Sequence, residues 1–284
     1  MRSVVVTGAS TGIGWGCVKV LTGKDFHVFG SVRKQADADR LKAEFGGRFT
    51  PLIFDVTDAA AVNRGADEAA RALEGATLAG LVNNAGIAVA GPMLYLDIDE
   101  LRRQLEVNVV AQAIVTQAFA PLLGADPSRK GPAGRIVMIS SVGGRSSNPF
   151  TGPYNASKFA LEGLSESLRR ELMIFGIDVI VIAPGAVATP IWDKAEEIDV
   201  SRYANTAYAG SLGKLKEYML TLGRKGFPPE KIGEAVYTAL TAKRPKVRYT
   251  VTPDPVQNFM MTTLPKRMVD NLVAKQLGLN KPRT

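Results

Sequence analysis

The chain has 284 residues, of which 46% are hydrophobic and 22% are charged, and its formal net charge is +8. This balance is typical of a globular protein with ample material for a large core. The single cysteine, Cys17, excludes an internal disulfide framework and indicates a reducing compartment, so we expect a cytoplasmic protein.

Apolar runs alternate with helical segments along most of the chain. The first run, at residues 3–8, is too brief for a signal peptide and turns straight into glycine, so we predict a strand there. Further strands are predicted at 27–32, 49–56, 78–86, 134–141, 177–185 and 246–253. Helices are predicted between them, over residues that reach about Leu21, over 36–45, up to Leu73, over 99–123 and from Tyr154 onward.

This alternation predicts the fold class. Strands that are apolar throughout are covered on both faces, so their alternation with helices indicates a doubly wound, Rossmann-type α/β parallel sheet. No internal repeat or low-complexity linker marks a boundary, so we expect a single domain over 1–284. No stretch approaches 18 uninterrupted apolar residues, so no transmembrane helix is expected.

A glycine-rich turn, TGASTGIG, follows the first predicted strand and opens a helix. Its glycines are Gly8, Gly12 and Gly14. Glycine allows a ligand to approach the backbone closely, and the amide groups at a helix start can hold a pyrophosphate. Such a turn alone is a weak signal, but its place between strand and helix favours dinucleotide binding.

Four motifs stand in the order and spacing of one enzyme family. They are TGASTGIG at Thr7–Gly14, NNAG at Asn83–Gly86, YNASK at Tyr154–Lys158 and PGAVAT at Pro184–Thr189. In these motifs, which spread over about two thirds of the chain, the sequence resembles the short-chain dehydrogenase/reductase family. The stretches KFALEGLSESLRREL and KRPKVRYTV further resemble its branch that acts on steroids, retinoids and similar lipids.

Tyr154 and Lys158 are the central catalytic candidates. Residues four apart lie on one face of a helix, so the phenol and the amine point the same way. A phenol has a pKa of about 10, and a neighbouring ammonium favours the phenolate and lowers that value. The resemblance implies that Tyr154 exchanges the substrate proton, while Lys158 lowers its pKa and holds the nicotinamide ribose. The alternative is a half-buried tyrosine beside a solvated lysine.

Two further catalytic positions are implied by the resemblance. Ser141, thirteen residues before Tyr154, would hydrogen-bond the substrate oxygen, and the adjacent Ser140 would line the coenzyme site instead. Asn108, in LEVNVV, would position a water in the proton relay. The alternative for Asn108 is a helix asparagine whose amide is satisfied by backbone groups.

The resemblance also implies the coenzyme contacts. Besides Tyr154 and Lys158, they are Gly8, Ser10, Thr11, Gly12, Ile13, Gly14, Arg33, Asp55, Val56, Asn84, Ala85, Gly86, Pro184, Gly185, Val187 and Thr189. NAD-binding members carry an acid at the end of the second strand, where this chain has Val32 followed by Arg33. A guanidinium suits a phosphate, so NADP(H) is favoured, with NAD(H) as the alternative. Asp55 has a second interpretation as a cap of the next turn.

Other chemistries find little support. His27, the only histidine, lies at the start of a predicted strand, where a structural role is favoured. With one histidine and one cysteine there is no ligand cluster for a metal, so none is expected. The serines lack the G-x-S-x-G pattern of a nucleophile elbow.

Residues 186–227 are predicted to form a mobile wall of the substrate site. The apolar and aromatic residues of this segment suit an apolar alcohol or carbonyl substrate: Ile191, Trp192, Tyr203, Tyr208, Leu212 and Tyr218. The alternative is that these side chains pack the segment onto the body of the protein or onto another subunit.

Positive charge gathers in a C-terminal extension. Residues 243–284 hold nine Lys or Arg against two Asp, a net charge of +7. No nucleic-acid-binding motif accompanies this charge, so we expect no nucleic-acid partner. Leu264, Met268 and Leu272 recur at helical spacing and predict a short amphipathic helix. It could cover the substrate pocket, join a second subunit in a homodimer or homotetramer, or lie on a membrane surface; we favour the first two.

We therefore expect an NADP(H)-dependent oxidoreductase that interconverts an alcohol and a ketone or aldehyde, with Tyr154 as general acid and base. The alternative is a coenzyme-binding sensor or scaffold of the same fold without turnover. The presence of Asn108, Ser141, Tyr154 and Lys158 together argues against that alternative.

Overall fold

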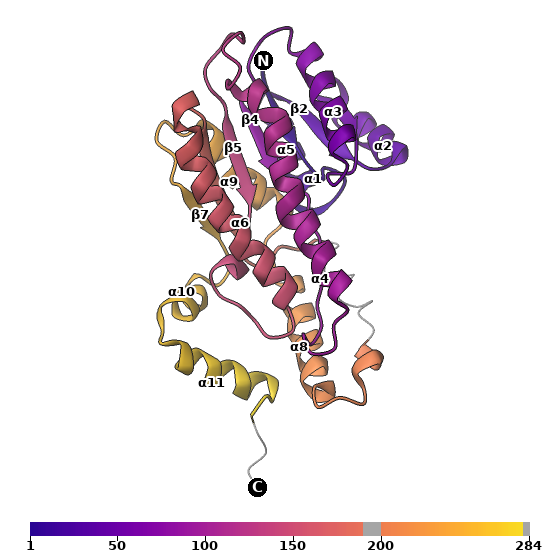
Figure 1. The fold of residues 1–284 in the computed structure, drawn as a ribbon, viewed down its shortest axis with the longest axis vertical. Coiled ribbons are helices and arrows are strands. Elements are labelled where there is room, and N and C mark those ends of the chain that lie inside the picture. The colour runs from indigo at the N-terminus through magenta and orange to yellow at the C-terminus, as the bar shows by residue number, and fades with distance from the viewer. Residues whose placement is uncertain (190–199, 281–284) are drawn as a thin grey trace.

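A sheet of seven parallel strands forms the centre of the computed structural model, which describes residues 1–189 and 200–280 (Figure 1). The strand order is β3-β2-β1-β4-β5-β6-β7. The strands are β1 (Arg2–Val6), β2 (Phe26–Val32), β3 (Phe49–Ile53), β4 (Gly80–Asn83), β5 (Arg135–Ile139), β6 (Asp178–Pro184) and β7 (Arg248–Val251). All seven were predicted, and the doubly wound fold class is confirmed. The strands predicted to reach residues 56 and 86 end earlier, at Ile53 and Asn83.

Helices cover both faces of this sheet. The helices are α1 (Gly12–Gly23), α2 (Gln35–Phe45), α3 (Ala59–Ala72), α4 (Ile98–Leu105), α5 (Ala111–Phe119), α6 (Gly152–Glu171), α8 (Ala209–Arg224), α9 (Pro229–Thr241), α10 (Pro255–Thr263) and α11 (Lys266–Leu277). Helices α8, α10 and α11 lie beyond one end of the sheet rather than on its faces (Figure 1). The predicted helix at 99–123 is composite, because a π-helical turn, η2 (Glu106–Val110), joins α4 to α5. Helices α9 and α10 were not predicted.

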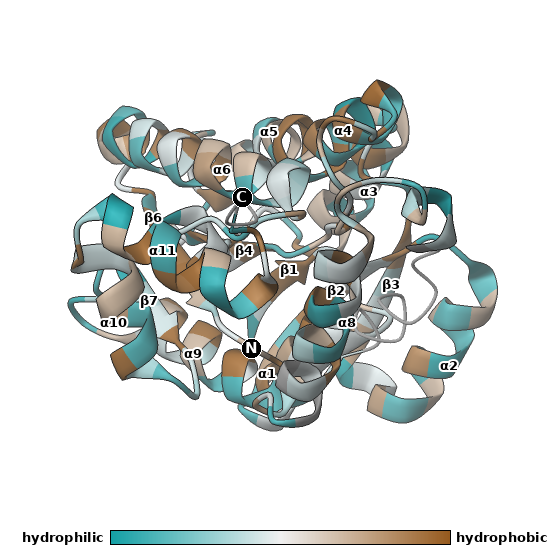
Figure 2. Cartoon of the chain, turned by 90° about the horizontal axis from the view of Figure 1, so that it is seen from below, coloured by the Kyte–Doolittle hydropathy of each residue, from teal (hydrophilic) through white to brown (hydrophobic). Residues whose placement is uncertain are grey.

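The strands bury alternate side chains in two separate cores. Val5 faces a core shared with α3, α5 and α6, while Val4 and Val6 face one shared with α1, α2 and α9. Seen along the strands, one row of helices lies above the sheet and the other below it (Figure 2). Burial on both sides explains why the strands are apolar throughout.

The order of the strands places a crevice at the middle of the sheet. β1 pairs with β2 on one side and with β4 on the other. The strands up to β3 therefore extend the sheet in one direction from β1, and the strands from β4 onward extend it in the other. In open sheets of this kind, ligands bind where the order reverses, outside the carboxyl ends of the strands. The glycine-rich turn after β1 and the NNAG motif at the end of β4 both lie there.

One helix, Ile98–Leu123, is long and apolar enough to cross a membrane by length and composition alone, and 39% of its apolar window is buried. Its residues Ala111, Val115 and Phe119 are fully buried in the core beside α3 and α6. We therefore interpret it as a core helix.

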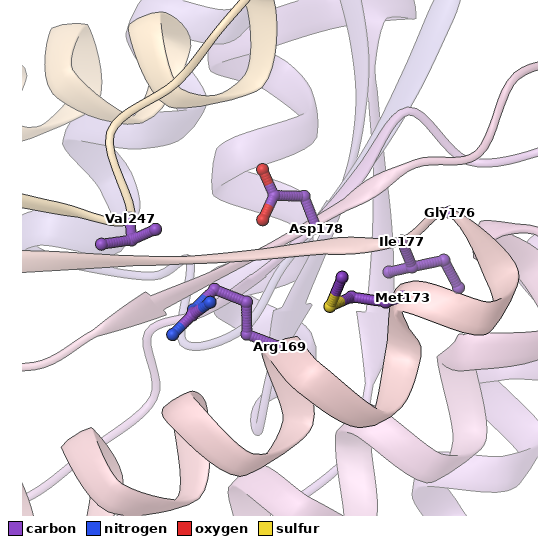
Figure 3. Close-up of a pocket in the computed structure, with 6 residues that line it drawn as sticks. All are labelled: Arg169, Met173, Gly176, Ile177, Asp178 and Val247. Atoms are coloured by element: carbon purple, nitrogen blue, oxygen red, sulfur yellow. The ribbon is translucent and has the colours of Figure 1, made fainter.

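A shallow hollow lies at the opposite edge of the sheet from that crevice (Figure 3). Its volume is about 310 Å³, and its walls are Arg169, Met173, Gly176, Ile177, Asp178 and Val247. Asp178 begins β6, whereas the motif residue Pro184 ends it. At about 3.3 Å per residue, the hollow is some 20 Å from the predicted coenzyme site.

Helices α1 and α9 pack closely because glycine stands at their contact. A β-carbon on Gly16 would lie 2.5 Å from the carbonyl carbon of Pro229, and one on Gly233 would lie 2.6 Å from the oxygen of Gly16. Neither helix can accept a larger residue there without moving.

We expect Gly16→Ala to lower the free energy of unfolding by about 1–3 kcal/mol, because the added methyl group overpacks the contact. Gly23→Ala, at the end of the same helix, is the control, since nothing lies within 4 Å of its β-carbon position. That variant should be neutral or stabilising by up to about 1 kcal/mol. Urea unfolding of both variants measures the difference, and equal values would contradict the close-packing argument.

Candidate active site

Helix α6 presents Tyr154 and Lys158 at the carboxyl edge of the sheet. Pro153 lies in its first turn, where a proline suits a helix start. Leu161 is buried and Leu164, Leu168 and Leu172 pack against the same core, so the predicted leucine stripe anchors the helix.

Lys158 is almost fully buried, with 6% of its surface exposed. Its Nζ donates a hydrogen bond to the carbonyl oxygen of Ile139 at 2.8 Å and lies 5.7 Å from the centre of the Tyr154 ring. Burial lowers the pKa of Lys158 to about 8, against the opposing charge of Glu162. A solvated lysine, the alternative weighed above, does not describe this side chain.

The phenol of Tyr154 faces Ser141. Burial raises the pKa of Tyr154, and a hydrogen bond with the Ser141 hydroxyl only partly offsets that rise. The expected lowering by Lys158 is not seen, and burial is the main cause of the shift. The phenol of Tyr154 is therefore protonated near neutral pH.

Ser140 and Ser141 follow β5 and precede the short helix η4 (Val142–Gly144). Ser141 caps η4, where its Oγ accepts from the Gly143 amide at 3.0 Å. Ser140 is 3% exposed, and its Oγ has no hydrogen-bond partner within the described residues. Its Oγ lies 2.8 Å from where a Gly144 β-carbon would be, so Ser140 faces η4, and its place in the coenzyme site stays a prediction.

Asn108 lies in the π-helical turn η2 and is fully engaged. Its Oδ1 accepts from the Ile87 amide at 2.9 Å, and its Nδ2 donates to the Ile87 carbonyl and to Ser157 Oγ. These contacts fit the alternative, a backbone-satisfied asparagine. The water-positioning role stays a prediction.

Two neighbours of Asn108 were missed. Gln104 Nε2 donates to the Ile87 carbonyl and its Oε1 accepts from Val89, while Gln112 Nε2 donates to the Ala85 carbonyl. Three buried amides thus hold the loop after β4, which carries the NNAG motif. Their i, i+4, i+8 spacing in QLEVNVVAQ is the signal that could have revealed them.

The glycine-rich turn has the shape that a pyrophosphate needs. Gly8 and Gly12 adopt positive φ angles of 65° and 56°, and a β-carbon on Gly14 would lie 2.1 Å from the Gly8 carbonyl oxygen. Thr11, the N-cap of α1, makes no side-chain cap and the first turn holds no acid within the described part of the chain. The amide groups of Gly12, Ile13 and Gly14 therefore suit an anion.

Neighbouring segments close around this turn. Asn84 Nδ2 donates to the carbonyls of Thr7 and Gly8 at 2.8 and 3.2 Å. Thr189 lies over the turn, since a β-carbon on Gly12 would lie 3.3 Å from it. The Ser10 carbonyl accepts from Arg40 at 2.7 Å. Other predicted contacts border the same crevice: Ala85 and Gly86 follow β4, and Pro184, Gly185 and Val187 end or follow β6.

Arg33 and Asp55 face each other at the ends of β2 and β3. Arg33 Nη1 lies 3.9 Å from Asp55 Oδ2, and both side chains are substantially exposed. Asp55 Oδ1 also accepts from the amide and hydroxyl of Thr57, and this turn is the main cause that lowers its pKa. Asp55 therefore caps the turn, as its second interpretation held, while Arg33 stays available at the surface. The following residue, Val56, is buried.

Val32, however, does not point toward that surface. It is 2% exposed and packs in the core that includes Ala38 and Leu41 of α2. A carboxylate at this position would be buried, whereas the next side chain, Arg33, is exposed.

The segment 186–227 leaves the sheet and returns to the place where it began. Val187 and Phe227 form a parallel bridge, in which the Ala188 amide donates to the Phe227 carbonyl at 2.8 Å and the Phe227 amide donates to the Ala186 carbonyl at 3.0 Å. Between the two ends, Tyr203 and Leu212 join Phe150 in a small apolar core. Ile191 and Trp192 lie outside the described residues.

We call the segment 186–227 the lid, and its other aromatic side chains also make packing contacts. Tyr208 lies edge-on to Phe150 with ring centres 5.5 Å apart, and the Tyr218 hydroxyl accepts from Gln257 of α10 at 3.4 Å. Tyr203 is 2% exposed. These contacts fit the alternative in which aromatic side chains pack the lid onto the body.

Helix α11 packs on α8 and closes this lid core. Leu277 is buried in it, with Val273 and Leu279 packed alongside, and Ser211 of α8 contacts the Gly278 carbonyl at 3.5 Å. Of the predicted apolar stripe, Met268 and Leu272 are about half exposed. The amphipathic helix exists, but a neighbouring face of it is packed.

Residues predicted to be structural lie away from this site. His27 contacts Thr50 Oγ1 at 2.9 Å at the start of β2, and Cys17 is fully buried, which raises its pKa to about 12. No group of three or more His, Cys, Asp or Glu that could hold a metal occurs among the described residues.

Residues 2–199 match the family described as short chain dehydrogenase. The chain belongs to the short-chain dehydrogenase family. It is 39% identical over 278 residues to the NADPH-dependent 3-dehydrocapnine reductase of Ornithobacterium rhinotracheale, with 98% of each chain covered. It is 31% identical over 264 residues to human retinol dehydrogenase 5, covering 87% of this chain and 79% of that one.

A solved short-chain dehydrogenase from Streptomyces avermitilis has the same fold. Its TM-score is 0.75 at 27% identity, and the match covers 96% of this chain and 94% of that chain. With its relatives, the family membership makes this short-chain dehydrogenase an NAD(P)-dependent oxidoreductase, as the sequence motifs predicted.

Removing α11 should alter substrate binding by this short-chain dehydrogenase. A chain that stops before Leu264 loses Leu277 from the lid core, so we expect KM for the carbonyl substrate to rise while KM for the coenzyme stays unchanged. A chain that stops at Asn280, which keeps α11, is the control. Steady-state kinetics, mass in solution and liposome binding are measured together. Unchanged mass and kinetics with loss of liposome binding would contradict the lid role and favour a membrane contact.

Proposed function

We propose that this short-chain dehydrogenase uses NADPH to reduce an apolar ketone to a secondary alcohol. The observation that carries the proposal is the grouping of Ser141, Tyr154 and Lys158 at the carboxyl edge of the sheet, beside the glycine-rich turn. The names of two relatives, an NADPH-dependent reductase and a retinol dehydrogenase, support the coenzyme and the apolar substrate.

The reaction needs a proton donor and a stabiliser of negative charge. Bound NADPH would supply the hydride that adds to the carbonyl carbon. Tyr154 donates its phenolic proton to the carbonyl oxygen, and Ser141 hydrogen-bonds the same oxygen as charge develops on it. The Lys158 ammonium stabilises the phenolate that remains. The raised pKa of Tyr154 keeps the phenol protonated, as a proton donor requires.

The site's surroundings suit an apolar substrate. Phe150, which precedes α6, packs with Tyr208 and Leu212, so the surroundings of the helix start are apolar and favour apolar ligands. Met93, Leu94 and Tyr95, which precede α4, are exposed, and Tyr95 contacts Tyr208.

We further propose that the enzyme is a cytoplasmic homodimer or homotetramer, with membrane contact by α10 and α11 as the alternative outcome.

A coenzyme-linked screen tests the proposal directly. Ketones, aldehydes and alcohols of increasing chain length are each assayed with NADPH and with NADH. Turnover of apolar ketones with NADPH supports the proposed function, and binding of NADPH without turnover of any carbonyl or alcohol would contradict it.

Tyr154→Phe should lower kcat by on the order of 10²–10⁴, because the proton donor is lost, while NADPH still binds. Tyr237→Phe, on α9 and packed on Phe26, is the control and should keep wild-type activity. Stopped-flow or steady-state rates are compared with NADPH affinity from fluorescence. Near-normal turnover by the Tyr154 variant would contradict the proposed role of Tyr154 as proton donor.

Arg33→Ala should weaken the preference for NADPH over NADH by about ten- to a hundredfold, since a hydrogen bond to a charged group contributes about 1.5–3 kcal/mol. Arg102→Ala, an exposed arginine paired with Asp99, serves as the matched control. The measurement is the ratio of kcat/KM for the two coenzymes with one substrate. If the wild type favours NADH, Arg33 does not bind the 2'-phosphate that distinguishes NADPH from NADH.

A further inference from the structure

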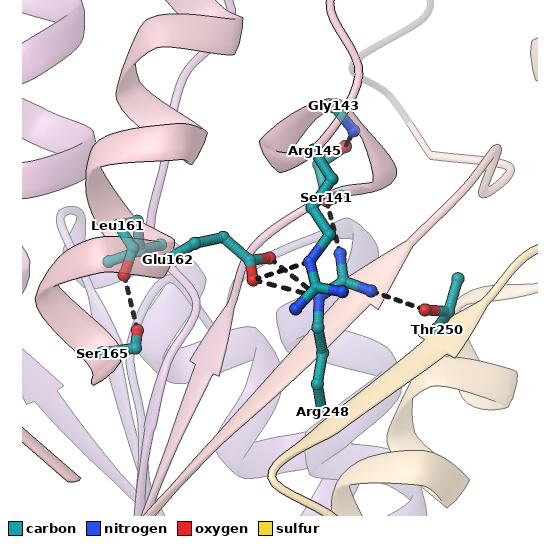
Figure 4. A network of polar contacts seen from close by, with 8 residues as sticks. All are labelled: Ser141, Gly143, Arg145, Leu161, Glu162, Ser165, Arg248 and Thr250. Atoms are coloured by element: carbon teal, nitrogen blue, oxygen red, sulfur yellow. Dashed lines mark hydrogen bonds and ion pairs between the residues drawn. The ribbon is translucent and has the colours of Figure 1, made fainter. Parts of the chain in front are cut away.

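A mostly buried ion pair lies between α6 and β7, close to the proposed catalytic residues (Figure 4). Arg248, the first residue of β7, donates from Nε to both carboxylate oxygens of Glu162 at 3.0 and 3.2 Å. The two side chains are only 12% and 15% exposed. Glu162 stands one helical turn after Lys158 on α6.

Arg248 joins three parts of the fold. Its Nη1 donates to Thr250 Oγ1 at 2.6 Å, and its Nη2 reaches the carbonyl oxygen of Ser141 at 3.5 Å. Arg145, just after η4, approaches Glu162 at 3.8 Å from a more exposed position. One guanidinium therefore links the edge strand, the helix that carries Tyr154 and Lys158, and the backbone of Ser141.

Such a pair is an expensive way to stabilise a fold. Removing two charges from water costs several kcal/mol per ion before the attraction is counted, and apolar residues of similar size often stabilise as well or better. The fork of an arginine, in contrast, fixes geometry, because its donors hold several acceptors at set angles. The contacts of Arg248 are of this second kind.

We propose that Glu162 and Arg248 are positioning residues of the active site, which hold α6 against the end of β5 and set the charge that Lys158 experiences. The proposal rests on the proposed function in one respect, namely that Lys158 must be an ammonium when Tyr154 releases its proton.

The charges around Lys158 determine the signs of the expected effects. Burial lowers its pKa to about 8, and Glu162 on the same helix opposes this. Arg248 on β7 and Arg145 after η4 neutralise part of the Glu162 charge, and the Tyr154 phenol lies on the other side. Loss of Glu162 should therefore lower the pKa of Lys158, whereas loss of Arg248 should raise it.

The test follows the alkaline limb of the pH dependence of kcat/KM for ketone reduction. Glu162→Gln should move this limb to lower pH by about 0.5–1 unit, and Arg248→Met should move it to higher pH by a similar amount. Arg248→Met should also lower kcat by about 10- to 100-fold, because misplacement of reacting groups costs rate. Arg248→Lys should restore the limb but recover kcat only in part, because it replaces the charge and not the fork.

The control pair lies on the same helix. Glu166 and Arg170 form an exposed ion pair one turn further along α6. Glu166→Gln and Arg170→Met should leave both the limb and kcat at wild-type values. If the Glu162 and Arg248 variants match these controls, or only lower Tm without opposite shifts of the limb, the proposal is wrong.

A second measurement does not depend on turnover. In protein with ¹³C at the lysine ε-carbon, the signal of Lys158 is assigned by its loss in Lys158→Met and titrated in each variant by NMR. Opposite shifts of the Lys158 pKa support the proposal even if no carbonyl is reduced, which would contradict the proposed function alone. Equal pKa values in wild type, Glu162→Gln and Arg248→Met would overturn the proposal.

Discussion

The hydrogen bond from Lys158 to the carbonyl of Ile139 is the contact around which the active site is organised. A buried ammonium needs a hydrogen-bond acceptor, and Lys158 on α6 reaches the last carbonyl of β5 at 2.8 Å. Because this bond joins helix to sheet, it fixes Tyr154 relative to Ser141, which begins the next turn. The same burial that demands the bond also brings the pKa of Lys158 close to the physiological range.

The opposite wall of the site depends on amides rather than charges. Gln104, Asn108 and Gln112 each bond to backbone of the loop that follows β4, and all three are buried. Amide groups satisfy both the donors and the acceptors of a loop that belongs to no strand ladder. The two walls therefore differ in their response to pH, since only the α6 side titrates.

The sequence predicted the fold well because the strands are buried on both faces. Continuous apolar runs such as IDVIVIAPG and turn glycines such as Gly8 are local signals, and the corresponding elements were found. It also predicted the residues that cluster at the carboxyl edge. It did not predict the pKa of Tyr154, because desolvation depends on how deeply the rest of the fold buries the phenol.

Other features were beyond local reasoning for similar reasons. Val32 ends a strand that is buried on both faces, so the sequence does not say which face this last residue of β2 will present. Helix α11 was predicted from Met268 and Leu272, yet Val269 and Leu277 are packed, because a helix with apolar residues on two faces can bury either. The Glu162–Arg248 pair joins residues 86 positions apart, which no spacing in the sequence reveals.

The bridge between Val187 and Phe227 holds the two ends of the lid together, so the lid is an insertion between β6 and α9. Since both ends of the segment are fixed side by side, a change in its length leaves the ends of β6 and α9 where they are. Each doubling of a flexible loop adds only about 0.6 kcal/mol of closure entropy. Insertions, deletions or whole grafts between these two residues could thus diversify what the enzyme accepts without disturbing the groups that perform the chemistry.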